Sequence, residues 1–181
     1  MLDFIFDYSE SGRWKKPFAA HDVGTYPLAN GQTYQGDMPV EETGNMLIMT
    51  TAIAIADGNA DYAAKHWEIL TAWSNYLAEA GMDPENQLCT EDFAGHLAHN
   101  ANLSAKAIMA IAGYGRLAEM LNKPEEAKKF TEMAKRMAIE WERRADDGDH
   151  YRLAFDMPGT WSQKYNFVWD KVLGLNILPD R

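Results

Sequence analysis

The 181-residue sequence contains almost no cysteine and no long hydrophobic run. Its single cysteine, Cys89, excludes an internal disulfide framework and a cluster of thiolate ligands for a metal, but does not identify the redox compartment. The longest apolar run, MLIMTTAIAIA at residues 46–56, is much shorter than the roughly 20 residues of a membrane-spanning helix. We therefore expect no membrane segment and no membrane partner.

Positive charge is also scarce. The chain has 17 Lys and Arg residues against 27 Asp and Glu residues, a net charge of −10, and a pI near 4.9. Such a negative field repels a phosphate backbone, so nucleic acid is not an expected partner. The first residues after Met1, LDFIFDYSE, carry acids where a signal peptide has basic residues, and we expect no export signal in this chain.

The composition is typical of a folded globular protein. Hydrophobic residues make up 46% of the chain and charged residues 24%, and no low-complexity tract interrupts them. The length suits one ordinary domain or a piece of a larger one. We therefore treat residues 1–181 as a single unit.

Helical patterns follow one another along the chain. Residues 2–8 resemble the tail of an amphipathic helix, which Ser11 and Gly12 end. Pro39 is suited to the first position of a second helix, and its apolar body, residues 46–56, predicts an inner helix surrounded by protein. Residues 60–81 then predict an outer helix with one apolar face.

The same pair of patterns recurs. Residues 102–121 predict a second inner helix and residues 123–145 a second outer one, opened by Pro124. The connections between each inner helix and its outer helix share the pattern Asn-x4-Ala-Lys. The pattern begins at Asn59 and at Asn122, an offset of 122 − 59 = 63 residues. This pattern predicts an all-α fold of tandem helical hairpins.

The remaining segments complete about two and a half hairpins. Residues 150–155, HYRLAF, predict a short strand, so the fold contains at most a short β hairpin. Residues 163–178 predict a final short helix that ends at Gly174 or Asn176. Residues 16–37 are irregular and aromatic, which is typical of a structured loop that carries a site.

Four spaced motifs resemble the C-terminal region of the large glutaminase A-like proteins of fungi and bacteria. The resemblance extends from about Phe18 to Pro179, in the order of the family, although the joint QTYQGD is shorter than in many relatives. The motifs are AHDVGTYPLANGQ, MPVEETGNMLIM, LCTEDFAGHLAHNANLSAKAI and WSQKYNFVWDKVLGLNIL.

The resemblance implies an (α/α)6 toroid of six helical hairpins, of which residues 1–181 form a fragment. It also implies hydrolysis of L-glutamine to L-glutamate and ammonia, and therefore a small-molecule substrate. We expect no cofactor. Family members are generally exported and much longer, so the resemblance implies a secreted or periplasmic longer parent. It supplies no catalytic residues that we can transfer to this sequence.

Two adjacent carboxylates, Glu41 and Glu42, are the first candidates for catalysis. Both fall in the first turn of the predicted helix, where compensation of the helix dipole is worth about 0.3–1 kcal/mol each. Alternatively, one of them faces inward, where desolvation raises its pKa and suits it to acid or base chemistry. Gly44 would allow a close approach one turn later, and Asn45 would supply an amide to the substrate.

The pair His21 and Asp22 is the second candidate. A loop aspartate usually accepts bonds from nearby backbone N–H groups and organises a turn. Alternatively, Asp22 is the second carboxylate of a two-acid site, with His21 and Tyr26 binding a polar substrate.

Asp92 is the third candidate, as an acid at the edge of a cleft. His96 and His99 lie nearby with the spacing His-x-x-His, which binds zinc on a helix when a third ligand is present. The sequence offers no third ligand at a convincing spacing, so we expect no metal.

Trp161, Lys164 and Tyr165, just before the final helix, are candidates for substrate binding. Aromatic residues at such a position more often pack in a core. Lys164 is nevertheless suited to bind the α-carboxylate of an amino acid.

Three functions remain open from the sequence. The first is a glutaminase A-like hydrolase in which Asp22, Glu41, Glu42 and Asp92 activate water against an amide. The second is a glycoside hydrolase of the same fold, in which two of these acids flank a sugar bond. The third is a helical binding or scaffold module without activity. A partial toroid should expose apolar edges, so we predict self-association, or weak stability and no turnover, for the isolated chain.

Overall fold

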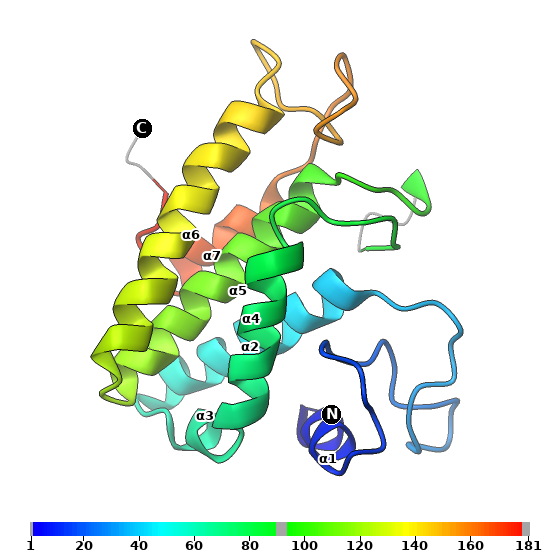
Figure 1. The fold of residues 1–181 in the computed structure, drawn as a ribbon, viewed down its shortest axis with the longest axis vertical. Helices are drawn as coiled ribbons and strands as arrows, with labels where there is room; N and C mark the ends of the chain where they lie inside the picture. Colours follow the sequence, from blue (N-terminus) through cyan, green and yellow to red (C-terminus); the bar gives the residue numbers. More distant parts are fainter. Residues whose placement is uncertain (1, 90–93, 179–181) are drawn as a thin grey trace.

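The structure is a computed structural model that describes residues 2–89 and 94–178. It is a bundle built from two helical hairpins and the beginning of a third (Figure 1). The inner helices are α2 (Pro39–Asp57) and α5 (Ala101–Met120), and their outer partners are α3 (Asp61–Lys65) with α4 (Trp67–Ala80), and α6 (Pro124–Ala145). The other elements are α1 (Leu2–Glu10), the 3-10 helix η2 (Tyr165–Phe167) and α7 (Val168–Val172).

The predicted all-α class is confirmed, but the strand predicted at residues 150–155 is wrong. The described residues form no sheet and contain only isolated antiparallel pairings, including Asp146 with Tyr151. Asp147 explains why this segment does not extend, because its carboxylate accepts bonds from Arg152 and from the backbone N–H of Gly159. These bonds close the segment into a compact loop.

The predicted beginning of the first inner helix is confirmed, and the helix ends directly after its predicted apolar body. Pro39 is the first residue of α2, a position at which a backbone N–H would have no partner within the helix, so proline costs no hydrogen bond there. Gly58 ends the helix with a left-handed φ of 67°, and the backbone N–H groups at this end donate to the carbonyls of Ala54 and Ile55. Local sequence signals therefore determine both ends of α2.

The outer helix predicted at residues 60–81 is broken into two pieces. His66 separates α3 from α4 with φ −115° and ψ 22°, which lie outside the helical range. Its ring stacks on Phe6 of α1 at 4.0 Å, and its Nδ1 lies 3.0 Å from a carboxylate oxygen of Glu10. These contacts with α1 account for a break that helix propensity alone does not predict.

Two close approaches set the register between the inner helices. A Cβ atom added to Gly44 would lie 2.8 Å from Cγ of Lys106, and one added to Gly113 would lie 2.6 Å from Oγ1 of Thr51. The contacts run in the same direction along both helices, so α2 and α5 are parallel. Both pairs are 62 residues apart (106 − 44 and 113 − 51), as are the helix starts (101 − 39), which agrees with a hairpin repeat.

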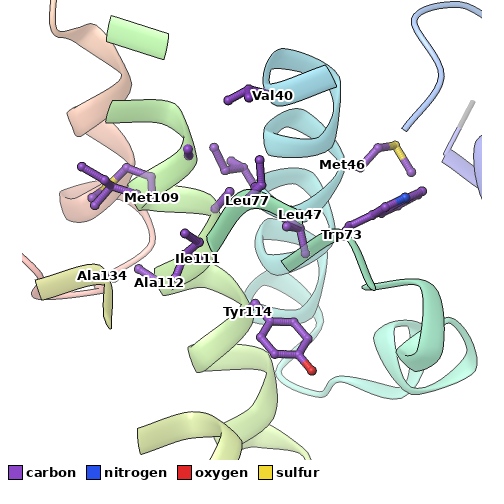
Figure 2. Close-up of a cluster of buried hydrophobic side chains, with 14 of the residues drawn as sticks. Val40, Met46, Leu47, Trp73, Leu77, Met109, Ile111, Ala112, Tyr114 and Ala134 are labelled. Carbon is purple, nitrogen blue, oxygen red and sulfur yellow. The ribbon is translucent and has the colours of Figure 1, made fainter. Parts of the chain in front are cut away.

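The core lies where α2, α4 and α5 meet (Figure 2). Trp73 and Leu77 from α4 and Leu47 from α2 are fully buried there beside residues of α5. Tyr114 of α5 is also fully buried, and its hydroxyl lies 2.7 Å from the hydroxyl of Thr71. Nearly every residue of α5 is buried, as expected for an inner helix.

The expectation that protein surrounds α2 on all sides is wrong for one face. Met49 and Ile53 remain partly exposed along this face, together with Glu42 and Asn45 nearer the start of the helix. The helices α3, α4 and α5 cover the other faces of α2. The partly exposed stripe therefore begins in the first turn of α2, which carries Glu41 and Glu42.

Long loops gather where the inner helices begin. Residues 11–38, before α2, and the described residues between α4 and α5 lie on the right of Figure 1, beside the first turns of α2 and α5. Across the described ranges, none of the helices combines the length and apolarity that a bilayer crossing requires. The parallel arrangement therefore places two helix starts and their loops at one end of the bundle.

Candidate functional site

A buried ion pair joins the two inner helices at this end. Nζ of Lys106 on α5 donates to Oε1 of Glu41 on α2 at 2.5 Å, and both residues are 4% exposed. The lysine stem crosses α2 at Gly44, which has no side chain to block it. Gly44 therefore allows a close approach to α2, as its position in the motif suggested, and the group that approaches is the side chain of Lys106 on α5.

Asn45 connects this ion pair to Glu42. Nζ of Lys106 donates to Oδ1 of Asn45 at 2.8 Å, and Nδ2 of Asn45 donates to Oε2 of Glu42 at 3.2 Å. We call these four residues, Glu41, Glu42, Asn45 and Lys106, the inner-helix cluster. The cluster combines two carboxylates, one amide and one ammonium group, contributed by two parallel helices.

Glu42 is the member of the cluster suited to proton transfer. Burial raises its pKa above the usual glutamate value, and the negative charge of Glu41 raises it further. The bond from Asn45 and the charges of His21 and Lys106 oppose this shift without cancelling it. Because Glu42 also remains partly exposed, a ligand can reach it, and the raised pKa favours its protonated form more than in an ordinary glutamate.

Asp22 organises the loop that lies over the cluster. Its Oδ1 accepts from the backbone N–H groups of Gly24 and Thr33, and its Oδ2 accepts from the N–H of Tyr34. Partial burial raises its pKa, but these bonds and one with His21 outweigh that effect and lower the pKa to about 2. This arrangement matches the turn-forming alternative for Asp22.

His21 of the same loop contacts Asp22 and Tyr34. Its Nδ1 is 3.1 Å from Oδ2 of Asp22, and its ring packs against Tyr34 with centroids 4.6 Å apart. Its charge acts on Glu42, so the imidazole is close enough to influence that carboxylate. The loop is held to α2 by the N–H of Ala19, which donates to Oγ1 of Thr43 at 3.0 Å.

We expect Asp22→Asn to lose stability mainly in neutral and weakly acidic solution. The folded-state pKa of Asp22 is depressed from 3.8 to about 2, so its contribution is present above pH 3.8 and disappears as the pH falls towards 2. Chemical denaturation of the 181-residue chain at several pH values measures this difference. Asp7→Asn, at an exposed position on α1, is the matched control. An equal loss at pH 7 and pH 2 would contradict the assignment.

Two of the other predicted substrate-binding residues are largely exposed, and a third packs against an aromatic ring. Tyr26 is 95% exposed, and no contact within residues 2–89 and 94–178 joins its side chain to the cluster. Trp161 is 68% exposed and stacks on His150 with centroids 4.1 Å apart. Nζ of Lys164 lies 4.2 Å from the ring centre of Tyr151.

Lys164 and Tyr151 line a pocket of about 460 Å³ between α6 and α7. Tyr165 begins η2 beside this pocket and is 41% exposed. The following residue, Asn166, donates to the backbone carbonyl of Asn102 at 3.0 Å, one helical turn before Lys106 on α5. This bond connects the third hairpin to the beginning of α5.

The predicted acid Asp92 lies outside the described residues, so the structure does not place it. His99 is bonded through Nδ1 to Asp83 at 2.7 Å. Within the part of the chain that the structure describes, no three His, Cys, Asp or Glu side chains are grouped to hold a metal ion.

Sequence reasoning missed Lys106, although the sequence contained a signal for it. Lys106 is the one charged residue in the apolar stretch ANLSAKAIMAIAGYG, residues 101–115. A lysine in a buried helix needs a charged or hydrogen-bonding partner, and the acids available for that role are not adjacent in sequence. Its pairing with Glu41, 65 positions earlier, depends on the parallel packing of α2 and α5.

The whole chain, residues 1–181, matches the family described as the glutaminase A six helical-hairpin domain. It is 36% identical to glutaminase A of Aspergillus oryzae over 186 residues, which cover 99% of this chain. It is also 26% identical over 234 residues, 96% of the chain, to a protein of Arthroderma benhamiae named a probable glutaminase. The chain spans 27% of the length of each relative. The chain therefore belongs to the glutaminase A six helical-hairpin domain family.

Proposed function

We propose that this chain forms part of the substrate site of a hydrolase that releases ammonia from L-glutamine. One observation carries the proposal: Glu42 is a partly exposed carboxylate with a raised pKa, at the end of the bundle where two inner helices and their loops meet. The names of the two relatives support the choice of glutamine as substrate.

Hydrolysis of an amide requires two proton movements. Glu42 takes a proton from water as the water oxygen bonds to the amide carbon. The same proton is then delivered to the amide nitrogen as the carbon–nitrogen bond breaks. The products are L-glutamate and ammonia. A carboxyl group with a raised pKa performs both steps better than an ordinary glutamate, because its two protonation states are closer in free energy near neutral pH.

The remaining groups have distinct roles in this proposal. Glu41 is engaged with Lys106 and contributes charge balance instead of activating water. His21, held by Asp22, and Asn45 contact polar atoms of the substrate. A role for Asp92 in catalysis, and for Tyr26, Trp161, Lys164 and Tyr165 in substrate binding, stays a prediction. So do export of a longer parent and self-association through apolar edges.

A product assay distinguishes the proposed functions. The 181-residue chain, and a longer polypeptide that contains it, are supplied with L-glutamine or with a panel of glycosides. We expect the longer polypeptide to release ammonia and L-glutamate from glutamine, the isolated chain to be inactive, and neither to release reducing sugar from the glycosides. Release of reducing sugar without ammonia would overturn the proposal in favour of a glycoside hydrolase. If neither product forms and calorimetry detects no glutamine binding, the third function is favoured, a module that binds another ligand or serves as a scaffold.

A further inference from the structure

Lys106 occupies an unusual position for a lysine, because its residue is 4% exposed in the middle of an apolar helix. Such burial is costly unless the ammonium group is paired and hydrogen-bonded. Glu41 supplies the opposite charge at 2.5 Å and Asn45 supplies a neutral acceptor at 2.8 Å. The lysine is therefore held in one place from two directions.

The chemistry of the ammonium group determines how Asn45 is turned. Lysine only donates hydrogen bonds, so the side-chain atom of Asn45 that faces it must be the oxygen, Oδ1. The amide nitrogen then points the other way, and it donates to Oε2 of Glu42 at 3.2 Å. Without Lys106, either end of the amide could face Glu42, and the oxygen would repel the carboxylate.

We propose that Lys106 is a positioning residue, which fixes the amide of Asn45 so that Nδ2 holds the carboxylate of Glu42 in its acting orientation. This inference rests on the proposed role of Glu42. Two hydrogen bonds form the path. The first runs from Nζ of Lys106 on α5 to the amide of Asn45 on α2, and the second runs from that amide to Oε2 of Glu42, three residues earlier on α2. Gly44 makes the path possible, because a Cβ atom there would meet the stem of Lys106 at 2.8 Å.

The effect of this hydrogen-bond path can be measured through the titration of Glu42. Burial and the charge of Glu41 favour its neutral form, whereas the Asn45 bond, His21 of the overlying loop and Lys106 of α5 favour its ionised form. Removing either Lys106 or the donor of Asn45 is therefore expected to raise the pH at which Glu42 titrates. If Lys106 acts on Glu42 only through its charge, its effect on the titration midpoint adds to the effect of Asn45. If Lys106 acts through the amide of Asn45, the two effects do not add.

The test is a double-variant cycle read by NMR of ¹³C-labelled glutamate side chains in the 181-residue chain. The signal of Glu42 is assigned by its absence in Glu42→Gln. We expect Lys106→Met and Asn45→Leu each to raise the titration midpoint of Glu42, and the double variant to raise it by less than the sum. Lys128→Met, at an exposed position on α6, is the control and leaves the midpoint unchanged.

Several outcomes would overturn the inference. Unchanged midpoints, or shifts that add fully in the double variant, would show that Lys106 does not act through Asn45. If Lys106→Met fails to fold, an unchanged midpoint in Asn45→Leu is sufficient to reject the path. The titration needs no catalysis, so it is separate from the proposed function. A confirmed path together with an active Glu42→Gln enzyme would reject only the catalytic role of Glu42.

Discussion

Replacing Glu42 with glutamine is expected to lower the rate of glutamine hydrolysis by about 10²–10⁴-fold, the usual contribution of a positioned acid or base. Glutamine has nearly the same shape and keeps an oxygen that can accept from Asn45. It cannot take a proton from water. The rate is measured as ammonia release by a polypeptide for which the wild-type activity has been established.

The same substitution should not weaken the fold. The folded-state pKa of Glu42 is raised, so its ionised form is disfavoured by folding, and stability falls as the pH rises through that pKa. Glu42→Gln removes this penalty and should raise the melting temperature slightly at neutral pH. Glu68→Gln, at an exposed position on α4, is the matched control for both measurements. Full activity in Glu42→Gln would remove this carboxylate from the mechanism.

Replacing Lys106 with methionine is expected to destabilise the chain by about 3–5 kcal/mol, because it removes the ammonium group that pairs with the buried carboxylate of Glu41. The methionine has nearly the length of the lysine stem, so lost packing explains little of this effect. Equilibrium denaturation in urea measures the free energy of unfolding.

A second substitution separates charge from packing. Glu41→Leu in the Lys106→Met background removes the carboxylate that paired with Lys106, and we expect it to recover at least half of the lost stability, since apolar residues often replace a buried ion pair without penalty. Lys128→Met serves as the exposed-lysine control and should change stability little. If the double variant is less stable than Lys106→Met alone, the buried charge is not the cause of the loss.

The helices were largely predictable because their signals are local. Pro39 and Pro124 mark helix starts, and Gly58 marks an end, through properties of their own backbones. The break at His66 was not predictable, because it follows from contacts with Phe6 and Glu10 in a helix far away in sequence. The strand predicted at residues 150–155 was wrong for a similar reason, since side-chain bonds from Asp147 decide that loop.

The candidate site was only partly predictable. The sequence identified Glu41, Glu42 and Asn45 as a polar group at a helix start, and His21 with Asp22 as a loop pair. It could not show that Glu41 forms a buried ion pair while Glu42 stays partly exposed with a raised pKa. That division depends on Lys106, which reaches α2 only because of the packing at Gly44.

The sequence by itself determined the helical class, the hairpin repeat and the family, because these depend on spacing, on helix-ending residues and on motifs read along the chain. The tertiary structure alone decided which polar groups meet. The parallel register of α2 and α5 brings Lys106 to Glu41 and Asn45, and burial of Glu42 beside them raises its pKa. Both effects act through space between residues that are distant in sequence, so no local pattern encodes them.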